Sequence, residues 1–207
     1  MPRQNRVTPF GETIAHPARG LVFGNRGCLH DDDGRIRRRY AGRAWIACRL
    51  SFKDRRRALM QPRRYTELFF LDDATALAAG HRPCAECRRQ DYLQFTELWP
   101  RSASQRPLAP AVDARLHAER LTDFGTQRHH ERPLDEVPDG AFVVRDGAPW
   151  LVCGHELMRW TPAGYTDAVA RPAGRQAVVI TPPSTVAVLQ RGWRPTAVPL
   201  LHDSARC

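Results

Sequence analysis

Cys84 and Cys87 form the only Cys-x-x-Cys pair of the chain, within residues 80–89. Two thiolates at this spacing can bind one metal ion, and a thiolate-rich ligand set is typical of zinc sites. Pro83 lacks a backbone N–H and holds the chain out of a helix just before the pair. Because structural zinc takes four protein ligands, the pair predicts half of a Zn²⁺ site and requires further ligands elsewhere.

A strand and a helix are expected to position this pair. Residues 65–71 are typical of a strand, and either Asp72 or Asp73 is a suitable N-cap for the helix that follows. Gly80 suits the position just after a helix, where a left-handed conformation is common. The helix therefore leads directly into the two cysteines.

A second strand is expected over residues 45–52. With strict alternation, Ile46, Cys48 and Leu50 share one face of it. Cys48 is thus a further thiol on a regular element.

Residues 67–87 end in Ala-Leu-Ala-Ala-Gly-His-Arg-Pro-Cys-Ala-Glu-Cys and resemble the second half of the Ada-type metal-binding domain. The stretch Ile46-Ala47-Cys48-Arg49 is similar to an earlier strand of that domain, so the resemblance covers roughly residues 40–90. It implies that Cys48, Cys84 and Cys87 bind Zn²⁺. It also implies that Cys48 accepts a methyl group from a DNA phosphotriester.

The chain departs from this family at the fourth ligand. The family has a cysteine four residues after the methyl acceptor, where this chain has Phe52, which cannot bind a metal. His30 is the first candidate for the missing ligand, because its turn could fold back beside Cys48; Cys28, a water or no fourth ligand are the alternatives. Loss of one thiolate weakens the nucleophile, whereas an open coordination position suits hydrolysis.

The net charge of +10 is concentrated in the first third of the chain. Residues 1–67 contain 16 of the 32 basic residues and 6 of the 22 acidic ones, which leaves 16 of each sign in the rest. A basic segment of this kind is typical of nucleic-acid binding, so DNA is the expected partner. The arginines expected to contact it are Arg37, Arg38, Arg39, Arg43, Arg49, Arg55, Arg56, Arg57, Arg63 and Arg64.

A second group of candidate catalytic residues follows position 100. His117 and Glu119 lie on a helix expected to begin at Pro110. A histidine and a carboxylate can act as an acid and base in hydrolysis. A surface helix with ordinary ion pairs is the simpler interpretation of the same residues.

The whole pattern predicts an α+β protein. Residues 1–100 are expected to form a small Ada-like, zinc-binding and DNA-binding domain, and residues 101–207 a β-rich domain with one or two helices. No apolar run is long enough to cross a bilayer, and residues 1–6 lack the apolar core of a signal peptide. These features predict a cytoplasmic protein that does not bind membranes.

Three functions are compatible with the sequence. The leading one is a zinc-dependent DNA-binding protein connected with recognition or repair of alkylated DNA. The second is a hydrolase acting on nucleic acid, assisted by zinc or by His117 and Glu119. The third is an RNA- or protein-binding module in which zinc is purely structural. Whether the protein is an enzyme is left open by the sequence.

Overall fold

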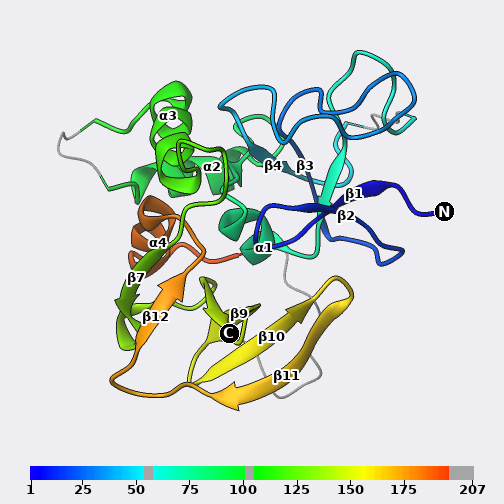
Figure 1. Ribbon diagram of the computed structural model, residues 1–207. Coiled ribbons are helices and arrows are strands. Elements are labelled where there is room, and N and C mark those ends of the chain that lie inside the picture. Colours follow the sequence, from blue (N-terminus) through cyan, green and yellow to red (C-terminus); the bar gives the residue numbers. More distant parts are fainter. Residues whose placement is uncertain (54–57, 101–104, 196–207) are drawn as a thin grey trace.

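The computed structural model describes residues 1–53, 58–100 and 105–195. Their four α-helices and two six-stranded sheets form an α+β fold (Figure 1), which confirms the expected class. One sheet is built from strands within residues 4–83 and the other from strands within residues 130–179. No helix in these ranges is long and apolar enough to span a membrane.

The first sheet has the strand order β2-β1-β5-β3-β4-β6. Its strands are β1 (Gln4–Val7), β2 (Thr13–Ala15), β3 (Val22–Asn25), β4 (Ile46–Cys48), β5 (Leu68–Phe70) and β6 (Arg82–Pro83). β3 lies antiparallel to both β4 and β5, with Phe23 opposite Cys48 on one side and Phe69 on the other. β6 lies parallel to β4 and pairs Pro83 with Ala47.

Two long loops connect the central strands of this sheet. Residues 26–45 join β3 to β4, and residues 49–67 join β4 to β5. The loops contact each other, because the Leu29 N–H donates to Thr66 Oγ1 and the Thr66 N–H donates to the Gly27 carbonyl. In Figure 1 both loops lie at the far end of the first sheet from the second sheet.

The residues that the structure describes also form four α-helices. They are α1 (Asp73–Ala78), α2 (Arg89–Glu97), α3 (Ala109–Arg120) and α4 (Pro183–Gln190). α1 begins as the sequence predicts, because the Asp72 carboxylate accepts a 2.7 Å hydrogen bond from the Thr75 N–H. Its C-cap is Ala79, and Gly80 follows with a φ of 82°, in the left-handed region.

The second sheet has the order β11-β10-β9-β8-β12-β7, and its paired strands run antiparallel. Its strands are β7 (His130–Pro133), β8 (Phe142–Arg145), β9 (Ala148–Cys153), β10 (Glu156–Thr161), β11 (Gly164–Ala170) and β12 (Gln176–Val179). β8 and β9 form an antiparallel hairpin, which pairs Phe142 with Leu151. A short 3₁₀ helix, Leu134–Glu136, follows β7.

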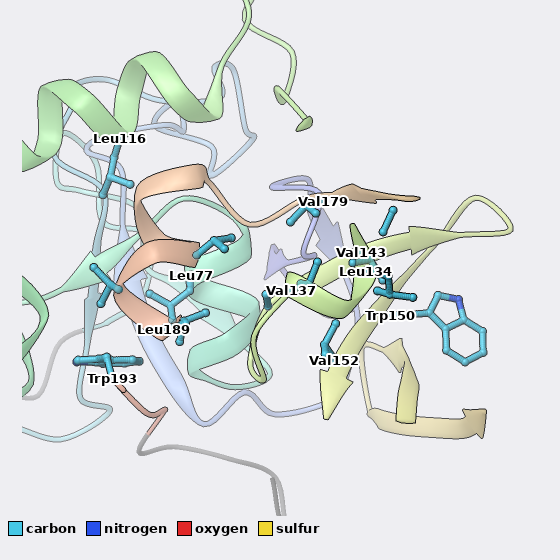
Figure 2. Packing of buried hydrophobic residues seen from close by; sticks show 14 of the residues in the cluster. Leu77, Leu116, Leu134, Val137, Val143, Trp150, Val152, Val179, Leu189 and Trp193 are labelled. Atoms are coloured by element: carbon cyan, nitrogen blue, oxygen red, sulfur yellow. The ribbon is translucent and has the colours of Figure 1, made fainter. Parts of the chain in front are cut away.

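The largest apolar cluster joins the helices to the second sheet. Figure 2 shows Leu77 of α1 and Leu189 of α4 between Leu116 of α3 on one side and Val143 and Val152 of the sheet on the other. Phe95 of α2 belongs to the same cluster. The cluster therefore contains residues from both sides of position 100, and the expected division into two domains there stays a prediction.

Candidate metal centre

Three cysteine thiols meet at the edge of the first sheet. Cys48 ends β4, and the Cys84 N–H donates to the Ala47 carbonyl at 2.8 Å, which continues the pairing of β6 with β4. The Sγ atoms of Cys48, Cys84 and Cys87 lie within 4.8 Å of one another. Tetrahedral zinc with Zn–S bonds of about 2.3 Å places its sulfurs about 3.8 Å apart, so this spacing fits a metal ion.

The backbone around the thiols favours deprotonated sulfur. The Glu86 N–H donates to Cys84 Sγ at 3.4 Å, and the Arg49 backbone donates to Cys87. Hydrogen bonds from the Cys48 and Cys87 thiols lower the pKa of Cys84 far below its usual range, while the same contact with Cys84 raises the pKa of Cys48. A cation in the cluster would replace these shared protons and hold all three groups as thiolates.

The three thiols line a pocket of about 400 Å³. Its remaining walls are largely apolar and aromatic, and they come from β3, β4, β5 and the 49–67 loop; they include Phe23, Ile46, Leu50, Phe52, Leu59, Tyr65 and Phe69. Asn25, Arg49, Glu67 and Glu86 add polar groups to the same lining. The centre is therefore accessible from a pocket rather than enclosed in the core.

Glu67 and Asn25 are pocket residues that the sequence interpretation missed. Glu67 is 5% exposed, and its Oε2 accepts a 2.6 Å hydrogen bond from the Met60 N–H. The signal was available, because alternation along the strand places residue 67 on the same face as Phe69. Glu67 is therefore a buried carboxylate in the wall of the thiol pocket.

His30 and Cys28 lie outside the thiol cluster. Both ring nitrogens of His30 are engaged, Nδ1 at 2.6 Å from Thr66 Oγ1 and Nε2 at 3.2 Å from the Gln61 carbonyl. Cys28 Sγ lies 3.6 Å from the His30 carbonyl oxygen. Phe52, which stands where the Ada-type family has its fourth cysteine, packs against the cluster instead. Among the residues described, the group contains cysteines alone.

His117 and Glu119 lie on α3, away from the residues that line the thiol pocket. His117 Nδ1 is 3.1 Å from Arg120 Nη2, and its ring meets the Tyr40 ring edge-on. Glu119 accepts hydrogen bonds from the Ser184 N–H and hydroxyl at the start of α4, and it pairs with Arg115. These contacts give both side chains a role in packing.

The arginines expected to bind DNA lie on the two long loops. Arg37, Arg38, Arg39 and Arg43 are exposed on the 26–45 loop, and Arg49, Arg63 and Arg64 are exposed on the 49–67 loop. Arg49 lines the thiol pocket, and Arg64 lines a smaller pocket that adjoins it at Glu67. Arg55, Arg56 and Arg57 fall outside the described residues.

Comparison of the chain with models of known protein families found no match, and comparisons with curated proteins and with solved structures found none either. The function must therefore be argued from the site itself.

Proposed function

We propose that this protein binds Zn²⁺ through Cys48, Cys84 and Cys87 and binds DNA through the arginines beside this centre, in the recognition or repair of alkylated DNA. The observation that carries the proposal is the position of the three thiols on the wall of an apolar pocket. Structural zinc sites enclose the ion with four protein ligands, whereas three ligands leave one coordination position for something else. An open position facing a pocket favours a centre that contacts a ligand.

The pocket suits an alkylated group better than a bare phosphate. Its aromatic walls exclude water, and an alkyl substituent removes charge and adds apolar surface. Bound zinc would supply the charge that keeps the three sulfurs deprotonated. Cys48 is the candidate alkyl acceptor, as the resemblance of residues 40–90 to the Ada-type domain also implies. With three thiolates its nucleophilicity is lower than with four, so recognition is the primary role that we propose.

The arginines on the pocket border supply the DNA-binding part of the proposal. Arg49 and Arg64 are exposed, and their guanidinium groups can neutralise phosphates on either side of a group held in the pocket. Each phosphate contact releases a counterion, so the affinity should fall steeply with salt.

A gel-shift titration on a short DNA duplex tests this proposal. Wild-type protein should bind at low salt, and a duplex with one methylphosphotriester should bind more tightly. The salt slope is the steepness with which the logarithm of the affinity falls with the logarithm of the salt concentration. Arg49→Gln and Arg64→Gln should each reduce this slope by about one unit. Arg159→Gln on β10, whose side chain is 52% exposed, is the control of equal charge change. Absence of DNA binding at low salt would contradict the proposal, and an equal slope on RNA would favour the RNA-binding function.

Hydrolysis of a nucleic-acid bond is a second candidate, which the position of Glu67 favours. Zinc with an open coordination position activates water, and a carboxylate in the same pocket can take up a proton. Glu67→Gln should keep the metal and lose turnover on a nucleic-acid substrate. His117→Ala and Glu119→Ala should keep turnover, because both residues pack elsewhere. Turnover that survives Glu67→Gln would remove this carboxylate from the reaction.

A further inference from the structure

Arg26 is a buried arginine without an acidic partner among the residues that the structure describes. Arg26 directly follows β3 in the sequence and is 2% exposed. Nε donates to His81 Nε2 at 3.2 Å and Nη1 donates to the Gly11 carbonyl at 2.8 Å, while Nη2 has no hydrogen-bond partner in the described ranges. Burial first, and then the nearby Arg120, lower the pKa of Arg26 to about 9. It therefore remains charged at neutral pH.

Arg120 adds a second buried positive charge next to it. This residue ends α3, is 1% exposed, and donates to the carbonyls of Gly80 and Arg43, but its Nε has no hydrogen-bond partner within residues 1–53, 58–100 and 105–195. Both guanidinium groups lie over the Trp45 ring, Arg26 at 4.0 Å and Arg120 at 3.9 Å from the centroid. Neither forms an ion pair with a carboxylate in the described part of the chain.

The other buried arginines show what is missing here. Arg82 forms a two-pronged ion pair with Asp113, and Arg88 pairs with Asp73 and Asp91. Buried charges are normally paired in this way, because the transfer of an unpaired ion out of water is costly. A cation–π contact offsets only part of that cost. Asp113 partly stabilises the charge on Arg120, whereas no carboxylate of the described residues stabilises the charge on Arg26. An anion from outside the chain would stabilise Arg26.

A groove of about 460 Å³ lies beside Arg26 and could receive that anion. Arg37, Arg38 and Arg39 line it together with Arg26 and Gly11, and one exposed acid, Glu12, is also present. A methyl group placed on Gly11 would lie 3.6 Å from Arg26 Nη2, so the unpartnered nitrogen is close to the lining.

A small space next to this groove is lined by both buried arginines. Its volume is about 20 Å³, enough for one water-sized group, and Gly11, Arg26 and Arg39 line both it and the groove. Arg120 and Trp45 also line this space. The groove shares no lining residue with the thiol pocket.

We propose that this groove binds a phosphate group, with Arg26 as its buried ligand and Arg39 as its exposed one. Guanidinium groups match the geometry of phosphate oxygens, and an oxygen directed at Arg26 Nη2 would provide the missing acceptor. The phosphate is either free or part of a nucleic-acid backbone; in the second case the inference rests on the proposed DNA binding. The two sources share the same recognition chemistry.

Calorimetric titration of the full-length protein with inorganic phosphate tests the free-phosphate source. Ionic strength is held constant with chloride. We expect saturable binding by the wild type and a dissociation constant about tenfold higher for Arg39→Gln. Arg159→Gln should bind like the wild type. Thermal melting of each variant checks that it is folded, and Arg39→Gln, at an exposed position, keeps the test available if Arg26→Lys fails to fold.

A parallel titration with duplex DNA distinguishes free phosphate from a backbone phosphate as the ligand. If phosphate does not bind but Arg39→Gln lowers the salt slope on duplex DNA relative to Arg159→Gln, the groove holds a backbone phosphate and the inference stands. If phosphate binds and DNA does not, the groove is a free-phosphate site and only the proposed DNA binding fails. The inference is overturned if phosphate has no effect beyond that of chloride and Arg39→Gln leaves DNA binding unchanged.

Discussion

At the scale of single residues, the three clustered thiols differ from Cys28 in their surroundings. Their sulfurs face one another across less than 4.8 Å, whereas the Cys28 thiol contacts a backbone carbonyl. Cys84→Ser should therefore reduce bound zinc from about one ion per chain to nearly none, because two thiolates do not hold the ion tightly. Elemental analysis after dialysis measures this stoichiometry.

Cys28→Ser and His30→Gln are the matched controls for this loss of metal. Neither side chain reaches the cluster, and both His30 ring nitrogens are engaged with Thr66 and Gln61. Both variants should keep the full zinc content of the wild type. Zinc loss in His30→Gln alone would instead identify His30 as the fourth ligand.

Prediction from the sequence succeeds at this scale where a motif is local. The spacing of Cys84 and Cys87 shows their proximity directly, and Cys48 joins them because β6 pairs with β4. The burial of Arg26 has no such local signal. It lies in an Asn-Arg-Gly stretch that predicts an exposed turn, and only the packing of Trp45, His81 and Arg120 around it removes it from water.

At the scale of elements, the end of α1 depends on its contact with α3. Gly80 has a φ of 82°, and a Cβ on it would lie 2.4 Å from Cδ of the buried Arg120. Gly80→Ala should therefore lower the unfolding free energy by more than the roughly 1–2 kcal/mol that an alanine in the left-handed conformation costs. Gly154→Ala is the control, since its φ is 57° and a Cβ there meets nothing within 4 Å. Equal losses of unfolding free energy in urea would show that Arg120 moves aside.

The ion pair of Arg82 with Asp113 joins α3 to the strand that precedes Cys84. Its two hydrogen bonds are both 2.8 Å, and the side chains are 6% and 8% exposed. Asp113→Asn should lower the unfolding free energy by about 3–5 kcal/mol, because it leaves a buried guanidinium unpaired. Asp167→Asn breaks the exposed pair with Arg159 and should cost less than about 1 kcal/mol. Comparable losses in urea denaturation would indicate that Arg82 is hydrated.

The sequence predicts elements that have strong local signals, and it does not predict the short strands. The cap at Asp72 and the glycine after α1 predict this helix within one residue of its observed end. Residues 1–19 and 126–138 have no clear strand periodicity, yet they contain β1, β2 and β7. These strands have three or four residues, and β7 has the polar sequence His-Glu-Arg-Pro. Such strands form because a neighbouring edge offers backbone partners, which periodicity does not reveal.

At the scale of the whole molecule, the excess positive charge lies on one sheet and its loops. The whole excess of positive charge lies in the first 67 residues of the chain. Apart from Arg3 and Arg19, the exposed arginines described there lie on the loops between β3, β4 and β5. The thiol pocket and the arginine groove are both formed in this part. The second sheet and α4 bury a large apolar surface against α1, α2 and α3. They thereby support the half that carries both candidate sites.

Stability of the whole fold should decrease in acid through His81. This ring is fully buried; burial first, and then Arg26 and Arg120, hold its pKa well below the usual value of 6.5. The unfolded chain binds a proton near pH 6.5 and the folded chain does not, so unfolding becomes easier as the pH falls below that value. Between about pH 7.5 and about pH 5.5 the loss from this group is about 1.4 kcal/mol.

His81→Gln isolates this contribution, because its amide oxygen can accept the Arg26 hydrogen bond and does not titrate. The unfolding free energy in urea should drop less for this variant than for the wild type over the same pH interval, by about 1.4 kcal/mol. Zinc release in acid affects both proteins and cancels in the difference. Parallel pH profiles would mean that the His81 ring takes up its proton within the folded protein, where Arg26 and Arg120 would then have to accommodate a third positive charge.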